Sequence, residues 1–165
     1  MMRRRTRLAA DQAGSAAAEM AMVTPILLAL MFGAFELGNF FLSEHVVQKG
    51  VRDAARYAAR LSMTNYPSCS VSGPAETQIQ RVARTGQPDG TTLRLRGWTA
   101  DSMTTVTLEC DSSGTFSGIY TDFPNGVPVI TVSASVPYPS LFGTLGLGNP
   151  SLTVNARSQS AVFGA

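Results

Sequence analysis

The stretch GSAAAEMAMVTPILLALMFGAFELGNFFL, residues 14–42, decides the fold of this 165-residue chain. Sixteen consecutive residues between Glu19 and Glu36 carry no charge, and the predominantly apolar run from Met20 to Leu42 has 23 residues. As a helix, this run is ~35 Å long at ~1.5 Å per residue, which covers the ~30 Å hydrocarbon core of a bilayer. The stretch therefore predicts a transmembrane helix over residues 15–42.

Basic residues are concentrated in a leader, residues 1–14, which has a net charge of +3, whereas the remainder of the chain has a net charge of −1. Positive flanks of a membrane helix resist translocation. We therefore expect the N-terminus in the cytoplasm and the residues after the helix outside it. Because the basic charge belongs to the leader and not to a surface, nucleic-acid binding is not expected.

A cleaved secretory signal peptide is the rival interpretation of the apolar run, and it would leave a secreted soluble binding domain. Such a peptide needs a short apolar core followed by a small-x-small cleavage site. Here the run is longer, and the bulky side chains of Phe35, Phe40 and Phe41 stand where cleavage would occur. A permanent helix is the preferred interpretation.

Two carboxylates accompany the run, and each leaves two interpretations open. An ionised carboxylate costs ~2.5–3.5 kcal/mol at the centre of a membrane helix, and such residues usually mark function. Glu19 either lies at the cytoplasmic interface among headgroups or pairs with a positive charge inside an assembly. Glu36 either reaches the outer interface or contacts a partner subunit, with Asn39 one turn away as a hydrogen-bond partner.

Three residues of the run are expected to shape its packing. Pro25 removes the N–H that would bond to the carbonyl of Ala21, so we expect a bend or local unwinding. Ala29 and Gly33 form a small-xxx-small pair, which allows a second helix to approach closely.

Residues 43–62 predict an amphipathic extension of the same helix. A row of small apolar residues recurs at spacings of three and four, which places it on one helical face. Its members are Val47, Val51, Ala54, Ala58 and Leu61. This face needs a cover, which we expect from the following domain or from neighbouring subunits.

Residues 63–165 are rich in Ser, Thr, Gly and Pro, and they predict an extracytoplasmic α+β domain. A short helix is expected between Pro74 and Gly86, over residues 75–85. Alternating apolar and polar residues predict about four strands, at 92–98, 103–110, 129–136 and 152–162. Residues 97–101 are expected to turn the first two strands into a hairpin. One wet face per strand indicates an antiparallel sheet, whose dry face we expect to pack against the helical extension.

The two cysteines of the chain, Cys69 and Cys110, both follow the apolar run. Disulfides persist outside the cytoplasm, and closing a loop of this length contributes ~4 kcal/mol in the chain-entropy model. A domain of about 100 residues with a sparse core benefits from such a link. We therefore predict a Cys69–Cys110 disulfide.

Motifs for catalysis and cofactor binding are missing from the sequence. None of GxxxxGK[ST], GxGxxG, HExxH, CxxC or GxSxG occurs, and the single histidine, His45, gives little basis for a catalytic or metal cluster. We expect no catalytic residue, metal site, cofactor or small-molecule substrate, and we do not expect an enzyme.

The residues around Gly14 are similar to a type IV prepilin signal, in which a basic leader ends in glycine and the fifth residue of the mature chain is glutamate. Gly14, Ser15 and Glu19 occupy these positions here. More narrowly, three ordered blocks resemble the TadE-like family, minor pseudopilins of the tight-adherence (Tad/Flp) branch of type IV pili. The blocks are Ala18–Pro25, Phe32–Gly38 and Ala54–Ala59. Met20 stands where a typical member has phenylalanine, and both side chains are apolar.

The resemblance implies that a prepilin peptidase cleaves between Gly14 and Ser15. The freed amine of Ser15 then lies one helical turn from Glu19, and the two charges neutralise each other within or between subunits. The implied protein is a minor pseudopilin of the bacterial inner membrane, which is stored there or joins an extracellular adhesive pilus with other pilin subunits. The alternative is an uncleaved single-pass inner-membrane scaffold or binding protein of the pilus secretion machinery.

Overall fold

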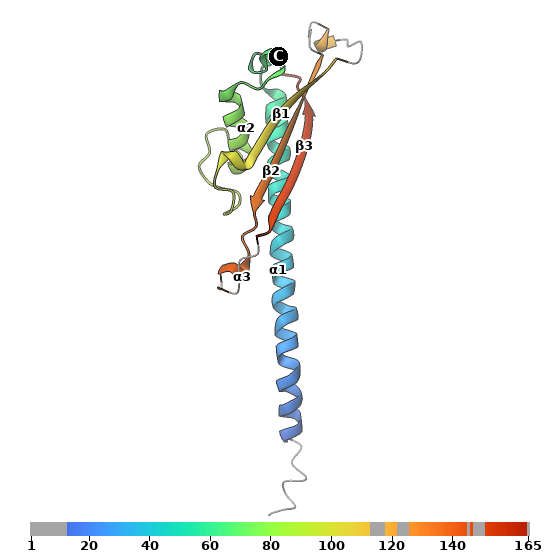
Figure 1. The fold of residues 1–165 in the computed structure, drawn as a ribbon, viewed down its shortest axis with the longest axis vertical. Helices are drawn as coiled ribbons and strands as arrows, with labels where there is room; N and C mark the ends of the chain where they lie inside the picture. The colour runs from blue at the N-terminus through green and yellow to red at the C-terminus, as the bar shows by residue number, and fades with distance from the viewer. Residues whose placement is uncertain (1–12, 113–117, 122–125, 145, 147–150, 165) are drawn as a thin grey trace, which may run out of the picture. The chain divides into compact units, whose positions relative to one another are not determined.

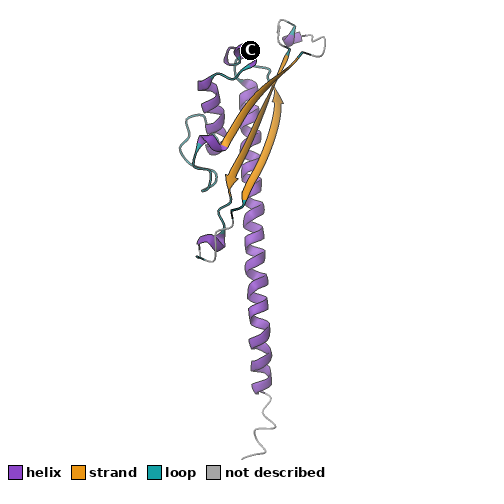
Figure 2. Cartoon of the chain, viewed as in Figure 1, coloured by secondary structure: helices purple, strands orange, loops and turns teal. Residues whose placement is uncertain are grey.

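The computed structural model describes residues 13–112, 118–121, 126–144, 146 and 151–164, so most of the basic leader lies outside the described residues. The chain divides into two compact units, Met1–Gly38 and Asn39–Ala165. The first unit holds the N-terminal part of the long helix α1, and the second holds its C-terminal part together with every strand that is described. Figure 2 shows the helices and strands.

Helix α1 spans Ala13–Arg60, a single helix of 48 residues. It confirms the predicted continuity of the apolar run and its amphipathic extension, since neither Pro25 nor Gly50 ends the helix. At the C-terminal end, unpaired carbonyls need partners. Leu61 N–H and the Tyr66 hydroxyl donate to the Ala58 carbonyl, and Phe163 and Gly164 N–H donate to the Ala59 carbonyl. Burial, with a smaller effect from Tyr57, raises the pKa of Tyr66 to about 12.

Three strands form one antiparallel sheet in the order β1-β2-β3: β1 is Thr104–Asp111, β2 is Val127–Pro137 and β3 is Thr153–Ala161. Three of the predicted strands are therefore confirmed, with ends that differ by one or two residues. In the register, Val106 lies opposite Val132, which lies opposite Ser158. The alternation that predicted the strands sends Val106 inward and its neighbours Thr105 and Thr107 outward.

Helix α2 spans Gly73–Thr85 and lies beside β1, as Figure 1 shows. Pro74 stands in its first turn, where the missing N–H costs nothing. Gly86 ends it in the left-handed region, at φ 94°. The buried face of α2 consists of Ala75, Ile79, Val82 and Ala83.

The core of the second unit lies between the sheet, α2 and the C-terminal part of α1. The predicted inner face of α1 is buried there, with Val47, Val51, Ala54 and Ala58 all 0% exposed. The sheet contributes Ile130, Val132, Val136 and Val154. The expected packing of α1 against the dry face of the sheet is thus confirmed.

The predicted strand at Thr92–Trp98 is wrong, and so is the hairpin at residues 97–101. In the described residues the sheet has three strands, and this segment forms turns that cross the two helices. Arg94 forms an ion pair with Asp53 on α1 at 2.8 Å, and its N–H donates to the Arg84 carbonyl on α2. These long-range contacts outweigh the local Leu-Arg alternation.

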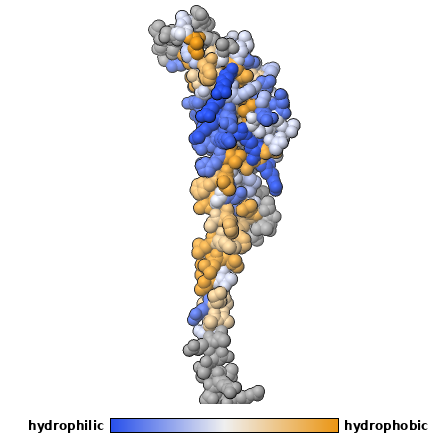
Figure 3. Space-filling view, turned by 180° about the vertical axis from the view of Figure 1, so that it is seen from behind, coloured by the Kyte–Doolittle hydropathy of each residue, from blue (hydrophilic) through white to orange (hydrophobic). Residues whose placement is uncertain are grey.

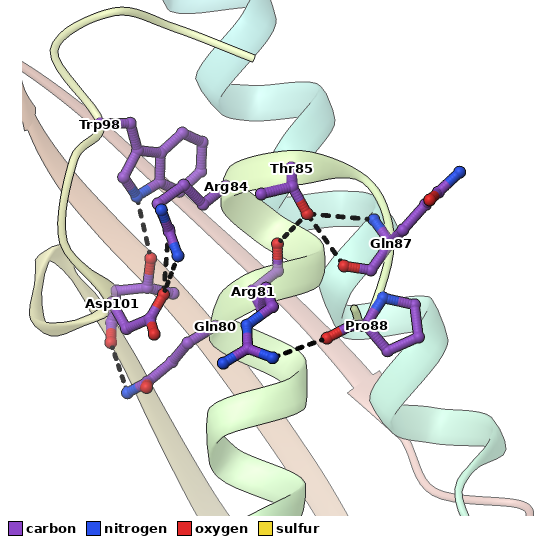
Figure 4. Close-up of polar contacts among 9 residues, drawn as sticks. Gln80, Arg81, Arg84, Thr85, Gln87, Pro88, Trp98 and Asp101 are labelled. Atoms are coloured by element: carbon purple, nitrogen blue, oxygen red, sulfur yellow. Dashed lines mark hydrogen bonds and ion pairs between the residues drawn. The ribbon is translucent and has the colours of Figure 1, made fainter. Parts of the chain in front are cut away.

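Trp98 fills the centre of the core and is 0% exposed. Its indole N–H donates to the hydroxyl of Thr104 at 3.1 Å, which satisfies two buried polar groups at once. Figure 4 shows the adjoining contacts on α2: Arg84 forms an ion pair with Asp101 at 2.9 Å, and Arg81 donates to the Pro88 carbonyl. This polar layer fixes the turn that leads from α2 into β1.

Short elements complete the second unit. The single-turn helices are η1 (Met63–Asn65), η2 (Pro67–Cys69), η3 (Asp101–Met103) and η4 (Gly118–Tyr120), and α3 is Leu141–Thr144. The structure joins Cys69 in η2 to Cys110 near the end of β1 by a disulfide. The link ties the segment that follows α1 to the edge strand of the sheet. The polar loop between β1 and β2 lies partly outside the described residues.

Gly50 of α1 lies against α2 and Trp98. A Cβ atom at this position would stand 2.5 Å from the Ala83 carbonyl oxygen and 2.9 Å from Cζ3 of Trp98. We predict that Gly50→Ala destabilises the protein by ~1–3 kcal/mol through overpacking, although the same change at an exposed helix position stabilises by ~1 kcal/mol. Urea unfolding in detergent, followed by Trp98 fluorescence, measures the difference.

Gly73→Ala is the matched control, because a Cβ at Gly73 meets nothing within 4 Å. Gly73 is exposed in the first turn of α2, so Gly73→Ala should leave the free energy of unfolding unchanged or raise it by up to ~1 kcal/mol. Unfolding midpoints for Gly50→Ala equal to or above the wild-type value would contradict the close packing.

Candidate functional site: the exposed apolar part of α1

The first unit presents an apolar helix whose side chains are exposed on all sides. Every described side chain from Gly14 to Gly38 is exposed except Glu36, which is half-buried. Eleven large apolar side chains in this segment have exposed fractions between 43% and 75%. Figure 3 shows hydrophobic side chains along this part of α1. By length and composition, α1 is able to cross a membrane.

Such a surface is unfavourable in water. Burying one large apolar side chain contributes ~1.5–3 kcal/mol, and the segment has eleven of them within one unit. An apolar surface of this extent marks a contact with lipid or with other chains. A helix also satisfies its backbone hydrogen bonds internally, which a bilayer requires. The segment is therefore suited to lipid and to neighbouring helices.

The predicted processing site lies in the first turn of α1. Gly14 and Ser15 are both exposed, and a Cβ at Gly14 would meet nothing within 4 Å. The N–H groups of a first helical turn have no partner within the helix, so this turn opens at little cost. The peptide bond at Gly14 is thus accessible from the solvent side.

Glu19 lies one turn further along. The Ser15 hydroxyl donates to Oε1 of Glu19 at 3.3 Å, and both side chains are exposed. The structure therefore brings the carboxylate to the residue whose amine cleavage after Gly14 would free.

Pro25 is accommodated inside α1. The Thr24 hydroxyl donates to the Met20 carbonyl at 2.6 Å, in the turn that precedes the proline. Side-chain hydroxyls of this kind bond to helix carbonyls near helix-breaking residues in membrane segments.

Ala29 and Gly33 are both exposed, and a Cβ built on Gly33 meets nothing within 4 Å. Glu36 stands three residues after Gly33 and is half-buried, whereas Glu19 is exposed. The predicted site residues of this segment are thus arranged along one helix, with a carboxylate near each end and small residues between them. No side chain described here covers the surface at Gly33.

A polar contact at the start of the second unit was not anticipated from the sequence. Asn39 donates through Nδ2 to the Tyr138 hydroxyl at 2.9 Å and to the Pro139 carbonyl at 3.1 Å. The rings of Phe40 and Tyr138 meet edge to face at 5.2 Å between centroids. Asn39 is the one amide side chain between Met20 and Leu42. That isolated polar group in an apolar run was the available signal, but its partner is 99 residues away in the chain.

Other surfaces offer less. An open concavity of about 650 Å³ lies over the outer face of the sheet, lined by small polar side chains such as Ser133 and Ser135 and by Asn155 and Arg157. Among the described residues, His, Cys, Asp and Glu form no group of three or more that suits a metal ion. The exposed helix remains the strongest candidate for function.

Comparison with known proteins supports the same segment. The family model described as TadE-like protein matches residues 14–56, and the predicted resemblance is confirmed over this segment. It covers the exposed apolar part of α1 and most of the buried extension. TadE-like proteins are a pilus-related structural family, so this segment, which includes a candidate membrane-spanning helix, suggests a Tad-pilus-associated protein. The comparisons with curated proteins and with solved structures find no match.

The openness at Gly33 gives a prediction that separates assembly from folding. Gly33→Ile should lower helix association in a membrane, because the branched side chain prevents close approach. It should leave the unfolding midpoint of the chain unchanged, because no neighbour within 4 Å is displaced. Energy transfer between labelled chains in vesicles measures the dimer fraction.

Leu30→Ile is the control for this measurement, since Leu30 is 66% exposed and the change preserves its volume and hydropathy. If Gly33→Ile and Leu30→Ile associate to the same extent as the wild type, Gly33 has no part in helix packing.

Proposed function

From the TadE-like segment at residues 14–56, we propose that this chain is a minor pseudopilin that takes part in assembling a Tad/Flp-type adhesive pilus. One observation carries the proposal: the segment that matches the family includes a helix that is apolar and exposed on all sides. Its role is structural, through packing and charge neutralisation. The partners of this helix are the lipid bilayer and the helices of other pilin or pseudopilin subunits.

The first step is storage in the bacterial inner membrane. The basic leader keeps the N-terminus in the cytoplasm, and the apolar run crosses the bilayer once. Residues after the run form the extracytoplasmic domain, in which the Cys69–Cys110 disulfide is compatible with an oxidising compartment. Residues 15–42 then serve as the membrane and assembly helix, residues 43–62 as its extension, and residues 63–165 as the outer domain.

The second step is cleavage by a prepilin peptidase between Gly14 and Ser15. Accessibility supports this step, because Gly14 and Ser15 are exposed in a helical turn that opens at little cost. Hydrolysis removes the basic leader and leaves a protonated amine on Ser15. Glu19 is one turn away, and its carboxylate already accepts a hydrogen bond from the Ser15 side chain.

The third step is assembly. A lone amine and a lone carboxylate are both costly in lipid. Pairing them, within one chain or between the Ser15 amine of one subunit and Glu19 of its neighbour, lowers that cost and favours side-by-side helices. Ala29 and Gly33 allow close approach, and Pro25 shapes the helix between Glu19 and Ala29. Glu36 supplies a second carboxylate for contact with a partner subunit.

Processing is tested at Gly14. Gly14→Leu should abolish cleavage, because a bulky side chain replaces the glycine at the cut. The mature mass should then correspond to a chain that retains the leader. Mass spectrometry of the protein from cells that make the peptidase checks this, with Gly73→Ala as a glycine control in the outer domain.

A wild-type chain that keeps Met1 in such cells would refute processing. It would favour the uncleaved single-pass scaffold as the function, provided that the chain is still needed for piliation.

Charge pairing is tested at Glu19. Glu19→Gln keeps the shape of the side chain and its hydrogen-bonding capacity but removes its charge, so cleavage should persist while incorporation into filaments falls sharply. Glu44→Gln is the matched control, since Glu44 is an exposed carboxylate of α1 beyond the apolar run. Immunoblots of sheared pilus fractions measure incorporation. Normal incorporation of the Glu19→Gln chain would sink the charge-pairing mechanism.

A further inference from the structure

The connection between β2 and β3 carries exposed apolar side chains that have no part in the function proposed for α1. Leu141 is 42% exposed and Leu152 is 52% exposed, on either side of the part of this connection that is not described. Between Asp122 and Arg157 the sequence contains no charged residue. The connection therefore combines exposed leucines with an uncharged surrounding, which is unusual for a loop in water.

One hydrogen bond places Leu152 beside Tyr138, and Leu141 lies close to Tyr138 along the chain. Tyr138 N–H donates to the Leu152 carbonyl at 2.9 Å, and Leu141 begins α3 three residues after Tyr138. The Tyr138 hydroxyl and the Pro139 carbonyl both accept from Asn39 of α1. The two leucines therefore lie near Asn39, at the N-terminal edge of the second unit.

The helix itself changes character at this level. Phe41 is 50% exposed and Leu42 is 67% exposed, whereas Ser43 is buried and Glu44 is an exposed carboxylate. Asn39 to Leu42 are thus the last residues of the apolar run, and charged side chains follow directly. In a chain whose apolar run crosses a bilayer, these residues reach the outer boundary between hydrocarbon and headgroups.

We propose that Phe41, Leu42, Leu141 and Leu152 form a membrane-contact patch that lies in the outer lipid interface of the bilayer crossed by α1. The occupant is lipid for two reasons on the chain itself. Phe41 and Leu42 end the apolar run itself, and the bonds from Asn39 to Tyr138 and Pro139 hold the β2–β3 connection beside this end. That connection also has no charged residue, which suits contact with lipid better than exposure to water. The patch rests on the proposed membrane anchoring of α1.

The consequence is a second attachment of the outer domain to the membrane. The helix provides one attachment. The β2–β3 connection, which accepts the hydrogen bonds from Asn39, provides the other. Two attachments restrict the rotation of the second unit above the bilayer, which presents its polar sheet face in a defined direction to subunits in the same membrane.

The experiment places a tryptophan in the patch. Leu141→Trp and Leu152→Trp chains are reconstituted, in separate samples, in phosphatidylcholine–phosphatidylglycerol vesicles with or without brominated acyl chains. The emission of each introduced tryptophan should be quenched by the brominated lipid. Trp98 adds a constant background, since it is 0% exposed in the core.

Ile119→Trp is the matched control. Ile119 is 62% exposed and belongs to the β1–β2 connection, at the other end of the 11-residue strand β2. That strand separates the two loops by roughly 35 Å at ~3.3 Å per residue. Its emission should not be quenched.

Flotation of the vesicles separates the two levels of the argument. If the chains float but neither Leu141→Trp nor Leu152→Trp is quenched, the proposed patch is refuted and the membrane anchor is retained. Equal quenching at Ile119 overturns it as well, because the whole domain then adsorbs to lipid. Chains that do not float refute the anchor and the patch together. Quenching at Leu141 or Leu152 alone, with Ile119 unquenched, supports the patch. Two separate variants are used so that the test does not depend on a single substitution that fails to fold.

Discussion

The apolar surface of α1 between Met20 and Leu37 is the constraint on which the rest of the structure depends. Its large apolar side chains are exposed, so this segment is suited to lipid or to contact with other helices. The same helix then continues into the second unit, where it forms one side of the core. Its side chains change accordingly, from large and exposed to small and buried: Val47, Val51, Ala54 and Ala58 meet the sheet, and Gly50 allows Trp98 and α2 to approach.

Several separate links stabilise the second unit in addition to its apolar core. Trp98 joins α1, α2 and the start of β1 through packing and one hydrogen bond to Thr104. The disulfide at Cys69 secures the segment after α1 to β1. The final residues bond to the last carbonyls of α1. The packing of Trp98 and the hydrogen bonds of residues 163 and 164 tie elements to α1, and the disulfide ties β1 to the segment that follows α1. The helix therefore organises this unit.

Periodic patterns predicted the elements, while contacts between distant residues escaped prediction. Period-two alternation located β1, β2 and β3, and the spacing of Val47 and Val51 located the buried helical face. The same alternation failed at Thr92–Trp98, because Arg94 is held by Asp53 and Trp98 enters the core. Neither the ion pair with Asp53 nor the burial of Trp98 can be read from a local sequence pattern. Likewise, Glu19 stood out as a carboxylate at the start of an apolar run, and Gly14 and Ser15 stood out through their resemblance to a prepilin signal. Asn39 and Tyr138 pair across 99 residues and were seen only in the structure.

An apolar helix in a bilayer does not associate with other helices through the hydrophobic effect, so its few small or polar residues must provide specific contacts. Lipid tails are as apolar as leucine, so no hydrophobic force draws two such helices together inside a bilayer. Association must come from close packing or from polar groups that lipid cannot satisfy. In the assembly proposed above, these are the open surface at Gly33, the Glu19 carboxylate beside Ser15, and Glu36. The large apolar side chains thus favour lipid as the surroundings of the helix, and the few exceptions determine which helix it contacts. A helix without them would insert into the membrane but would have no specific partner helix.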